Sequence, residues 1–409
     1  MVTAEEGERT SARSSRCLPS IQYGEAFLKR WGHTVSPPQR RARRDIGVCR
    51  TAALGGHIEQ CDGCAHEVMA YNSCRNRHCP KCQSTARDHW LAERAKELLP
   101  VPYCHVVFTV PEPLAPLALQ NPQLVYGLLF RAVSQTLLEI AADPRHLGAQ
   151  IGFLAVLHTW SQNLLHHPHI HCVVPAGGLA PDGSRWIPCR RKFFLPVKVL
   201  SRLFRGKFLA LLRDAFAAGK LQFHGQLAPL REPARFHAWL RPLQEIEWVV
   251  YAKLPFGGPE YVLKYLARYT HRVAISNGRL LSLENGQVTF QWRDSKDNNQ
   301  IKTMTLDAVE FIRRFLLHIL PSGFVKIRHF GFLSRRRRSA ALELCRQRLP
   351  QPVATTATAP ILTERQQCAV ERRCPACRTG KMHTRRWISA GELLAPVDHA
   401  KPAYQMDSS

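Results

Sequence analysis

His166-His167-Pro168-His169-Ile170-His171-Cys172 occupies residues 166–172 and runs directly into the apolar pair Val173-Val174. Alternate side chains of a β-strand point to the same face, so His169 and His171 project together while Ile170 turns into the core. Two neutral imidazoles on one rigid strand form half of a divalent-metal site. The triplet alone also fits a histidine-rich hairpin without metal, so the rest of the chain must decide between the two.

Composition points to a nucleic-acid partner. The chain has 409 residues, which favours two or three domains, and 57 Lys and Arg against 31 Asp and Glu give a formal charge of +26. Such an excess suits phosphate neutralisation, although basic ribosomal and membrane-surface proteins share it. No secretory signal and no apolar run of ~20 residues is visible in the sequence. We therefore expect a cytoplasmic, nucleoid-associated protein.

The 14 cysteines include paired Cys-x-x-Cys motifs, which in a cytosolic chain indicate metal thiolates rather than disulfides. Cys61-x2-Cys64 and Cys79-x2-Cys82 are separated by 14 residues. Two such turns at this separation predict a zinc ribbon with a structural Zn²⁺ on these four thiolates; redox dithiols are the alternative. Further candidate ligands lie in or beside this cluster: Cys49, His57, His66, Cys74 and His78.

The middle of the chain predicts an α+β fold. Apolar strands at Tyr103–Val110, Ile151–Trp160 and His169–Val174, with an amphipathic helix over 121–142, are consistent with a ferredoxin-like palm. The histidine pair would then lie on a central strand, on the open face of the sheet. Further elements are expected as a largely helical 195–242, a strand at Trp248–Leu254, a β-meander over Arg279–Thr305 and a helix at Leu306–Leu320.

A ladder of tyrosines lies in the segment 260–272, EYVLKYLARYTHR. Tyr261, Tyr265 and Tyr269 recur at i, i+4 and i+8, which places them on one helix face. An aromatic stripe packed on the sheet would show the same spacing. Basic residues expected to contact DNA lie near this ladder, beside the second cysteine pair and in a late run: Lys264, Arg268, Arg272, Arg75, Arg77, Arg335, Arg336, Arg337 and Arg338.

These residues suggest one mechanism. A divalent cation, Mg²⁺ or Mn²⁺, held by His169 and His171 would act as a Lewis acid on a scissile phosphate. A third polar ligand is expected, and of His158 and Gln162 the sequence slightly favours Gln162. A tyrosine would attack the phosphorus and leave a 5′-phosphotyrosine linkage with a free 3′-hydroxyl.

Five ordered blocks carry a resemblance to a known family: SCRNRHCPKCQ (73–83), HVVFTVPEPL (105–114), HTWSQNLLHHPHIHCVVPAGGL (158–179), YLARYTHRVAISN (265–277) and RHFGFLSRRRR (328–338). Over roughly residues 45–345 the chain resembles the rolling-circle insertion-sequence transposases of the insertion-sequence-ninety-one type, which are two-tyrosine HUH endonucleases. The resemblance implies a zinc-ribbon DNA-binding module and a metal-dependent nicking domain acting on single-stranded element ends and target DNA. It also implies that Tyr265 and Tyr269 are the catalytic pair, whereas Tyr261 has no firm counterpart.

Five regions are expected from this organisation. They are a basic mobile arm (1–44), a zinc-ribbon domain (45–100), an HUH catalytic domain (101–275), a β-meander and helix contacting DNA (276–345), and a linker with a tail (346–409). Within the tail, Cys374-x2-Cys377 together with Cys368 and His383 fits either a second small zinc site or free thiols.

Other functions remain open on sequence alone. A plasmid-type replication initiator or relaxase would use the same chemistry on an origin repeat. A zinc-ribbon DNA-binding protein without catalysis would leave the histidine pair unexplained. A small-substrate metalloenzyme is disfavoured by the +26 charge and by the lack of a His-Glu-x-x-His helix.

Overall fold

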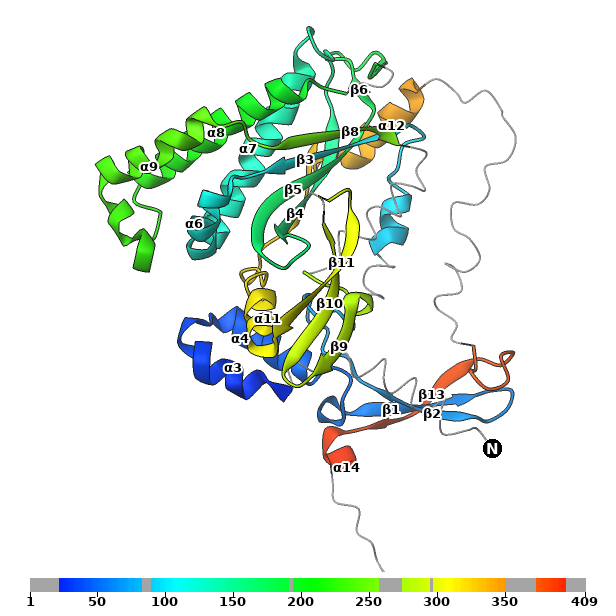
Figure 1. Ribbon diagram of the computed structural model, residues 1–409. Coiled ribbons are helices and arrows are strands. Elements are labelled where there is room, and N and C mark those ends of the chain that lie inside the picture. The colour runs from blue at the N-terminus through cyan, green and yellow to red at the C-terminus, as the bar shows by residue number, and fades with distance from the viewer. Residues whose placement is uncertain are drawn as a thin grey trace, which may run out of the picture.

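A five-stranded antiparallel sheet lies at the centre of the fold (Figure 1). The computed structural model describes residues 22–82, 90–190, 194–256, 274–294, 297–349 and 373–394. The strands of the sheet are ordered β12-β4-β5-β3-β8. Their bounds are β3 Tyr103–Thr109, β4 Gly152–Trp160, β5 His166–Pro175, β8 Val250–Phe256 and β12 Ile327–Gly331.

Two long helices, α7 (Pro122–Ala142) and α8 (Val197–Ala217), cover one face of this sheet (Figure 1). Alternate strand residues such as Phe108 and Ile170 pack beneath them in the largest hydrophobic cluster. By length and composition α7 would also qualify to cross a membrane, but 61% of its apolar window is buried inside the protein. Its apolar character is therefore that of a core helix.

The opposite face of the sheet is divided into two halves. At one end Tyr103, Leu154 and Val173 form an apolar cluster, covered by side chains from the segment 90–101. At the other end the same face carries histidines. The predicted strands and the helix over 121–142 are confirmed, and the histidine pair lies on β5, the central strand.

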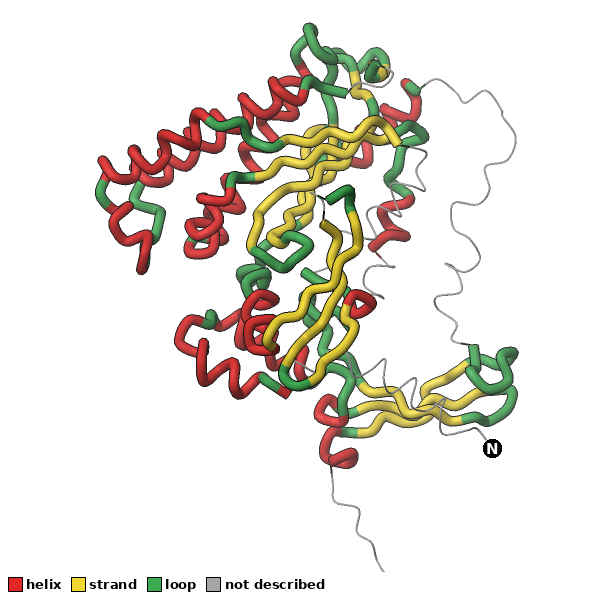
Figure 2. Tube along the Cα trace, viewed as in Figure 1, coloured by secondary structure: helices red, strands yellow, loops and turns green. Residues whose placement is uncertain are grey.

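A second module packs a three-stranded meander against helices from the beginning of the chain (Figure 2). The predicted meander and the helix that follows it are confirmed. The elements are β9 Leu280–Glu284, β10 Gln287–Asp294, β11 Gln300–Asp307, α11 Ala308–Leu316, α3 Gly24–Trp31 and α4 Pro37–Gly47.

The expected mobile arm over residues 1–44 is wrong for its described part, residues 22–44. Phe27 and Ile46 are buried in the same hydrophobic cluster as the meander. A capping box between Ser36 and Gln39 starts α4, with Pro37 in its first turn. The apolar residues of these helices recur at helical spacing, but they are few among many arginines, so the sequence pattern did not reveal them as a core face.

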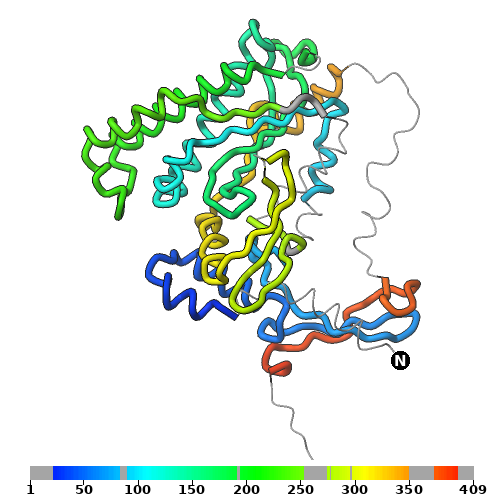
Figure 3. Tube along the Cα trace, in the orientation of Figure 1, coloured from blue at the N-terminus to red at the C-terminus, as the bar shows by residue number. Residues whose placement is uncertain are grey.

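A third unit joins residues that are far apart in sequence. The chain's blue and red strands lie side by side in Figure 3 as the sheet β13-β1-β2. Its strands are β1 Gly56–Cys61, β2 Glu67–Tyr71 and β13 Met382–Ile388. Residues 373–394 of the predicted tail are therefore part of a folded unit, and nothing in the sequence indicated that β13 would pair with β1.

The remaining elements lie within or beside these three units. They are η1 Gly32–Thr34, η2 Ala52–Leu54, η3 Glu112–Leu114, α6 Ala115–Gln120, β6 Gly177–Leu179, β7 Trp186–Pro188, η4 Gly225–Arg231, α9 Pro233–Glu245, η5 Asn277–Arg279, α12 Arg338–Arg348 and α14 Ala390–Leu394. The helix α9, for example, packs in the largest hydrophobic cluster.

Candidate metal centres

Three histidines from two neighbouring strands converge on the sheet face opposite α7 and α8. His169 and His171 project from β5, and His158 of β4 lies directly opposite His169 in the strand register. One ring nitrogen of each lies within 4.8 Å of those of the other two. The expectation that His169 and His171 share a face is confirmed, and the register adds His158 as a third member.

Hydrogen bonds orient His169 and His171 of β5. Nδ1 of His169 lies 2.7 Å from the carbonyl oxygen of His167, which can only accept, so Nδ1 carries the proton and Nε2 the lone pair. Nδ1 of His171 lies 2.9 Å from Nε2 of His105 on β3, and the two rings are parallel to within 3°. Partners of this kind fix the tautomer and orientation of metal-binding histidines.

Burial keeps these imidazoles neutral. It lowers the pKa of His169 to about 4. Burial also holds the pKa of His171 well below its ordinary value, and the neighbouring histidines add to the effect. Because a metal binds the neutral imidazole, the cluster needs no deprotonation at physiological pH.

Of the two candidates for a third ligand, Gln162 and His158, the structure brings His158 into the cluster. Gln162 is an exposed residue of the turn between β4 and β5, where its carbonyl oxygen accepts a hydrogen bond from Arg279. His158 is only 3% exposed and stands beside the pair. The signal was present in the sequence, since Leu154, Val156 and His158 alternate along one face of a strand.

The four cysteines predicted to share one zinc site divide between two clusters. Cys79 and Cys82 meet Cys49 and Cys74, with the Sγ atoms of Cys74 and Cys82 3.8 Å apart. This first cluster lies inside the hydrophobic cluster of the second module.

The second cluster pairs Cys61 and Cys64 with Cys374 and Cys377. Sγ of Cys61 lies 3.7 Å from Sγ of Cys377, and Sγ of Cys64 lies 3.6 Å from Sγ of Cys374. The single ribbon site is therefore corrected, because the β1–β2 hairpin carries Cys61 and Cys64 away from Cys79 and Cys82 to its far end (Figure 1).

Both cysteine clusters fit a tetrahedral thiolate site. With a Zn–S bond of about 2.3 Å, the sulfurs of a Cys₄ site are about 3.8 Å apart, whereas a disulfide needs about 2.05 Å. The thiol of Cys377 is already poised to ionise: a hydrogen bond from the Thr379 side chain, with help from the Gly380 amide, lowers its pKa to about 5.

Of the predicted DNA-contacting residues, some are exposed and others already bind groups of the protein. Arg75 and the run Arg335–Arg337 are exposed. Arg77 is half-buried and donates to the carbonyl oxygens of Pro321 and Phe324, so it joins the first cysteine cluster to the segment before β12, where Phe324 packs in the core of the five-stranded sheet. Arg338 forms an ion pair with Glu97. The predicted residues Tyr265, Tyr269, Lys264, Arg268 and Arg272, with Tyr261, lie outside the described residues.

Comparison with known proteins decides the family. Residues 20–110 match a family model described as "Transposase zinc-binding domain", and residues 152–340 match one described as "Putative transposase". The chain is 56% identical over 370 residues to the "Putative transposase y4qJ" of Sinorhizobium fredii, covering 89% of this chain and 92% of that protein. The chain belongs to the transposases of the insertion-sequence-ninety-one type.

This transposase is also 28% identical over 335 residues to the "Transposase for insertion sequence element IS801" of Pseudomonas savastanoi pv. phaseolicola, covering 78% of this chain and 76% of that protein. No solved structure matches it. The two family models include the histidine cluster and the first cysteine cluster, but neither reaches Cys374 or Cys377 of the transposase.

Proposed function

We propose that this transposase nicks and joins single-stranded DNA through 5′-phosphotyrosine intermediates during rolling-circle transposition. The observation that carries the proposal is the convergence of His158, His169 and His171 on one face of the sheet. A zinc-binding transposase without catalysis would leave three oriented, neutral imidazoles on one face of the sheet unexplained.

The connectivity of the sheet supports an HUH-type palm. The chain runs β3-α7-β4-β5-α8-β8, and those four strands lie in the order β4-β5-β3-β8 with every neighbour antiparallel. This order supports a βαββαβ arrangement of the ferredoxin-like kind, with β12 added at one edge. The histidines then come from the two strands of its central hairpin.

The donor set favours Mn²⁺ over Mg²⁺ at the nicking site. Mg²⁺ prefers oxygen ligands and retains several waters, whereas first-row transition metals accept imidazole nitrogen. When bound, the cation would polarise the scissile phosphate as a Lewis acid. His105, through its hydrogen bond to Nδ1 of His171, acts as a positioning residue for that ligand.

Tyr265 and Tyr269 supply the nucleophiles. The phenol oxygen forms a bond to phosphorus, the bond from phosphorus to the 3′ oxygen breaks, the phenol proton passes to solvent, and the 3′ oxygen leaves as a hydroxyl. One flank of this segment supports the assignment. Ala274, just after the segment, packs in one hydrophobic cluster with Leu164, in the turn that joins the two histidine strands β4 and β5. The other flank, β8, ends at Phe256 on the edge of the same sheet, where β3 separates it from β5.

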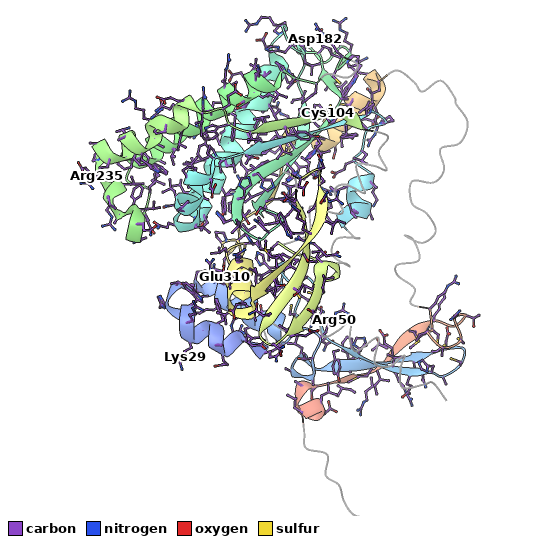
Figure 4. The ribbon with its side chains drawn as sticks, in the orientation of Figure 1. Lys29, Arg50, Cys104, Asp182, Arg235 and Glu310 are labelled. Carbon is purple, nitrogen blue, oxygen red and sulfur yellow. The ribbon has the colours of Figure 1, made fainter. Side chains whose placement is uncertain are left out.

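A surface on the β13-β1-β2 sheet is suited to single-stranded DNA. Tyr71 and Trp387 are 44% and 66% exposed, and they line one hollow together with Arg50 and Arg75. Figure 4 shows Arg50 where this sheet meets the second module. Exposed aromatic rings stack on bases of any sequence while arginines bind the backbone. The exposed run Arg335–Arg337 would add phosphate contacts.

The test is a covalent-adduct assay with single-stranded oligonucleotides from the ends of the element. Wild type with Mn²⁺ is expected to form a protein–DNA adduct that EDTA abolishes, with Mg²⁺ supporting it only at higher concentration. Tyr265→Phe and Tyr269→Phe are expected each to reduce the adduct and together to remove it. Tyr261→Phe, on the same segment, is the matched control and is expected to leave it intact.

Two results would redirect the proposal. Tight DNA binding without an adduct under any metal would identify a zinc-dependent DNA-binding protein. Cleavage of origin repeats in preference to element ends would identify a replication initiator or relaxase with the same chemistry.

A further inference from the structure

We infer that Cys61, Cys64, Cys374 and Cys377 form a second structural Zn²⁺ site that fastens β13 onto the β1–β2 hairpin. The site lies outside the zinc-binding family match at Cys374 and Cys377, and outside the other family match altogether. It is distinct from the first cluster, whose four sulfurs lie on residues 49–82.

Backbone amides already donate hydrogen bonds to sulfurs of both Cys-x-x-Cys turns, as they do in zinc knuckles. The N–H of Gly63 donates to Sγ of Cys61, and the N–H of Gly380 donates to Sγ of Cys377, both at 3.3 Å. The N–H of Ala376 donates to Sγ of Cys374 at 3.4 Å. Donors of this kind stabilise thiolate over thiol, so each Cys-x-x-Cys turn is preorganised for a cation.

Close approach of the two turns depends on a glycine. A Cβ atom at Gly380 would lie 2.4 Å from Sγ of Cys61, a distance that would force the sulfur to move. The neighbouring residue ties the turns together: the N–H of Lys381 donates to Oδ1 of Asp62 at 2.7 Å, and the N–H of Asp62 donates to the carbonyl oxygen of Lys381. The two turns are therefore fitted to each other.

The sheet that these turns close has little else to hold it. None of the hydrophobic clusters among the described residues includes a side chain from β1, β2 or β13. Five of the seven residues of β13 are exposed. Three short strands without a buried core are marginal in water, and a structural metal commonly supplies the missing stability. The Zn²⁺ therefore holds β13, and with it Trp387, in place.

The experiment counts zinc in the full-length protein, purified under reducing conditions in a His169→Ala background that removes the histidine site from the count. We expect two zinc ions per chain. Cys374→Ser/Cys377→Ser is expected to lose one of them and to raise hydrogen exchange in residues 56–61 and 382–388. Cys49→Ser/Cys74→Ser is expected to lose the other and to leave the exchange of residues 382–388 low. Cys189→Ser, outside both clusters, is expected to retain two.

Variants that keep all four cysteines separate a metal site from a general loss of folding. Gly380→Ala is expected to weaken zinc retention against a chelator at least tenfold, whereas Gly391→Ala, with only the Ser389 hydroxyl near its added methyl, is expected to change nothing. Cys377→His, which restores a zinc ligand, is expected to recover the second ion that Cys377→Ser loses.

Three results would overturn the inference. The first is one zinc per chain in the parent protein, and the second is two zinc ions retained after Cys374→Ser/Cys377→Ser. The third is disulfides linking Cys61 to Cys377 and Cys64 to Cys374 in protein purified under reducing conditions with zinc present. None of these measurements depends on DNA cleavage, so the nicking proposal stands or falls separately.

Discussion

The histidine cluster and the cysteine clusters are built in opposite ways. The three histidines come from adjacent antiparallel strands of one sheet, and the strand register alone brings His158 opposite His169. The cysteines of the second cluster come from segments 316 residues apart in the chain. The first site is a property of one sheet, whereas the second exists only when two remote segments meet.

This difference teaches what each site can tolerate. Removing one histidine removes a ligand from a sheet that other side chains hold together, so chemistry should be lost while the fold remains. Removing a cysteine removes a ligand from a site that helps to hold the fold, so structure should be lost first. The predictions below test this contrast.

The largest effect is expected at His158. His158→Ala should reduce adduct formation by about 1000-fold, because loss of a metal ligand forfeits several kcal/mol of transition-state stabilisation. The matched variant Gln162→Ala, in the adjoining exposed turn, should change the rate by less than about threefold. Single-turnover adduct formation with Mn²⁺ measures both, and circular dichroism should show both variants folded. A larger loss for Gln162→Ala than for His158→Ala would restore the ligand that the sequence favoured.

The next effect is expected at the first cysteine cluster. Cys79→Ser should lower the melting temperature by about 10 °C, because several kcal/mol of metal-binding energy is coupled to the hydrophobic cluster around α4 and α11. Cys64→Ser should lower it by no more than about 2 °C, because none of the hydrophobic clusters among the described residues includes a side chain of its sheet. Calorimetry measures both. Equal shifts for the two variants would show that the clusters are not structurally independent.

A smaller effect is expected at the exposed aromatic residue of β13. Trp387→Ala should weaken binding of a single-stranded oligonucleotide about tenfold, since one base stacked on an aromatic ring contributes about 1–3 kcal/mol. Ile301→Ala on β11 removes a side chain with a similar exposed fraction, 64% against 66%, and should leave affinity unchanged. Fluorescence anisotropy at fixed salt makes the comparison. Equal affinities for the Trp387→Ala variant and wild type would move DNA binding to another surface.

The smallest effect concerns a histidine beside the site that is not a ligand. His318 is buried, with Nε2 donating to the carbonyl oxygen of Leu164, and burial lowers its pKa to about 4. The unfolded chain takes up this proton first, so stability is complete above pH 6.5 and falls as pH drops from 6.5 towards 4. His318→Gln should flatten the decline in melting temperature between pH 7 and pH 5 by about 2 °C. An unchanged slope would show that His318 is already protonated in the fold.

The sequence predicted those features that depend on local periodicity. The two-residue alternation through His169, Ile170 and His171 identified both the strand and the face on which the imidazoles lie. The helix over 121–142 and the meander over 279–305 followed from similar patterns. In each case neighbours in sequence are neighbours in structure, so a pattern is sufficient.

The sequence could not show which Cys-x-x-Cys turns share a metal site, because the turns are equivalent in sequence. Each Cys-x-x-Cys turn supplies two thiolates in the same geometry, and spacing alone favoured joining the two nearest turns. The actual partners are set by tertiary structure: Cys49 follows α4 in a hydrophobic cluster, and Cys374 arrives with β13. The helix α4 was missed for a related reason, since its apolar residues are sparse among arginines and become a core face only against the meander.

The pairing of β13 with β1 determines when, during synthesis of the chain, the sheet can be completed. Residues 382–388 are synthesised beginning 311 residues after Tyr71, the last residue of the hairpin that they complete, a delay of roughly 15–60 s at usual rates of synthesis. Throughout that interval β1 has one open edge, of the kind that pairs with other chains. A chain that stops before residue 382 keeps the whole histidine cluster but never closes this edge. Completion of synthesis is thus a condition for assembling the surface that carries Trp387.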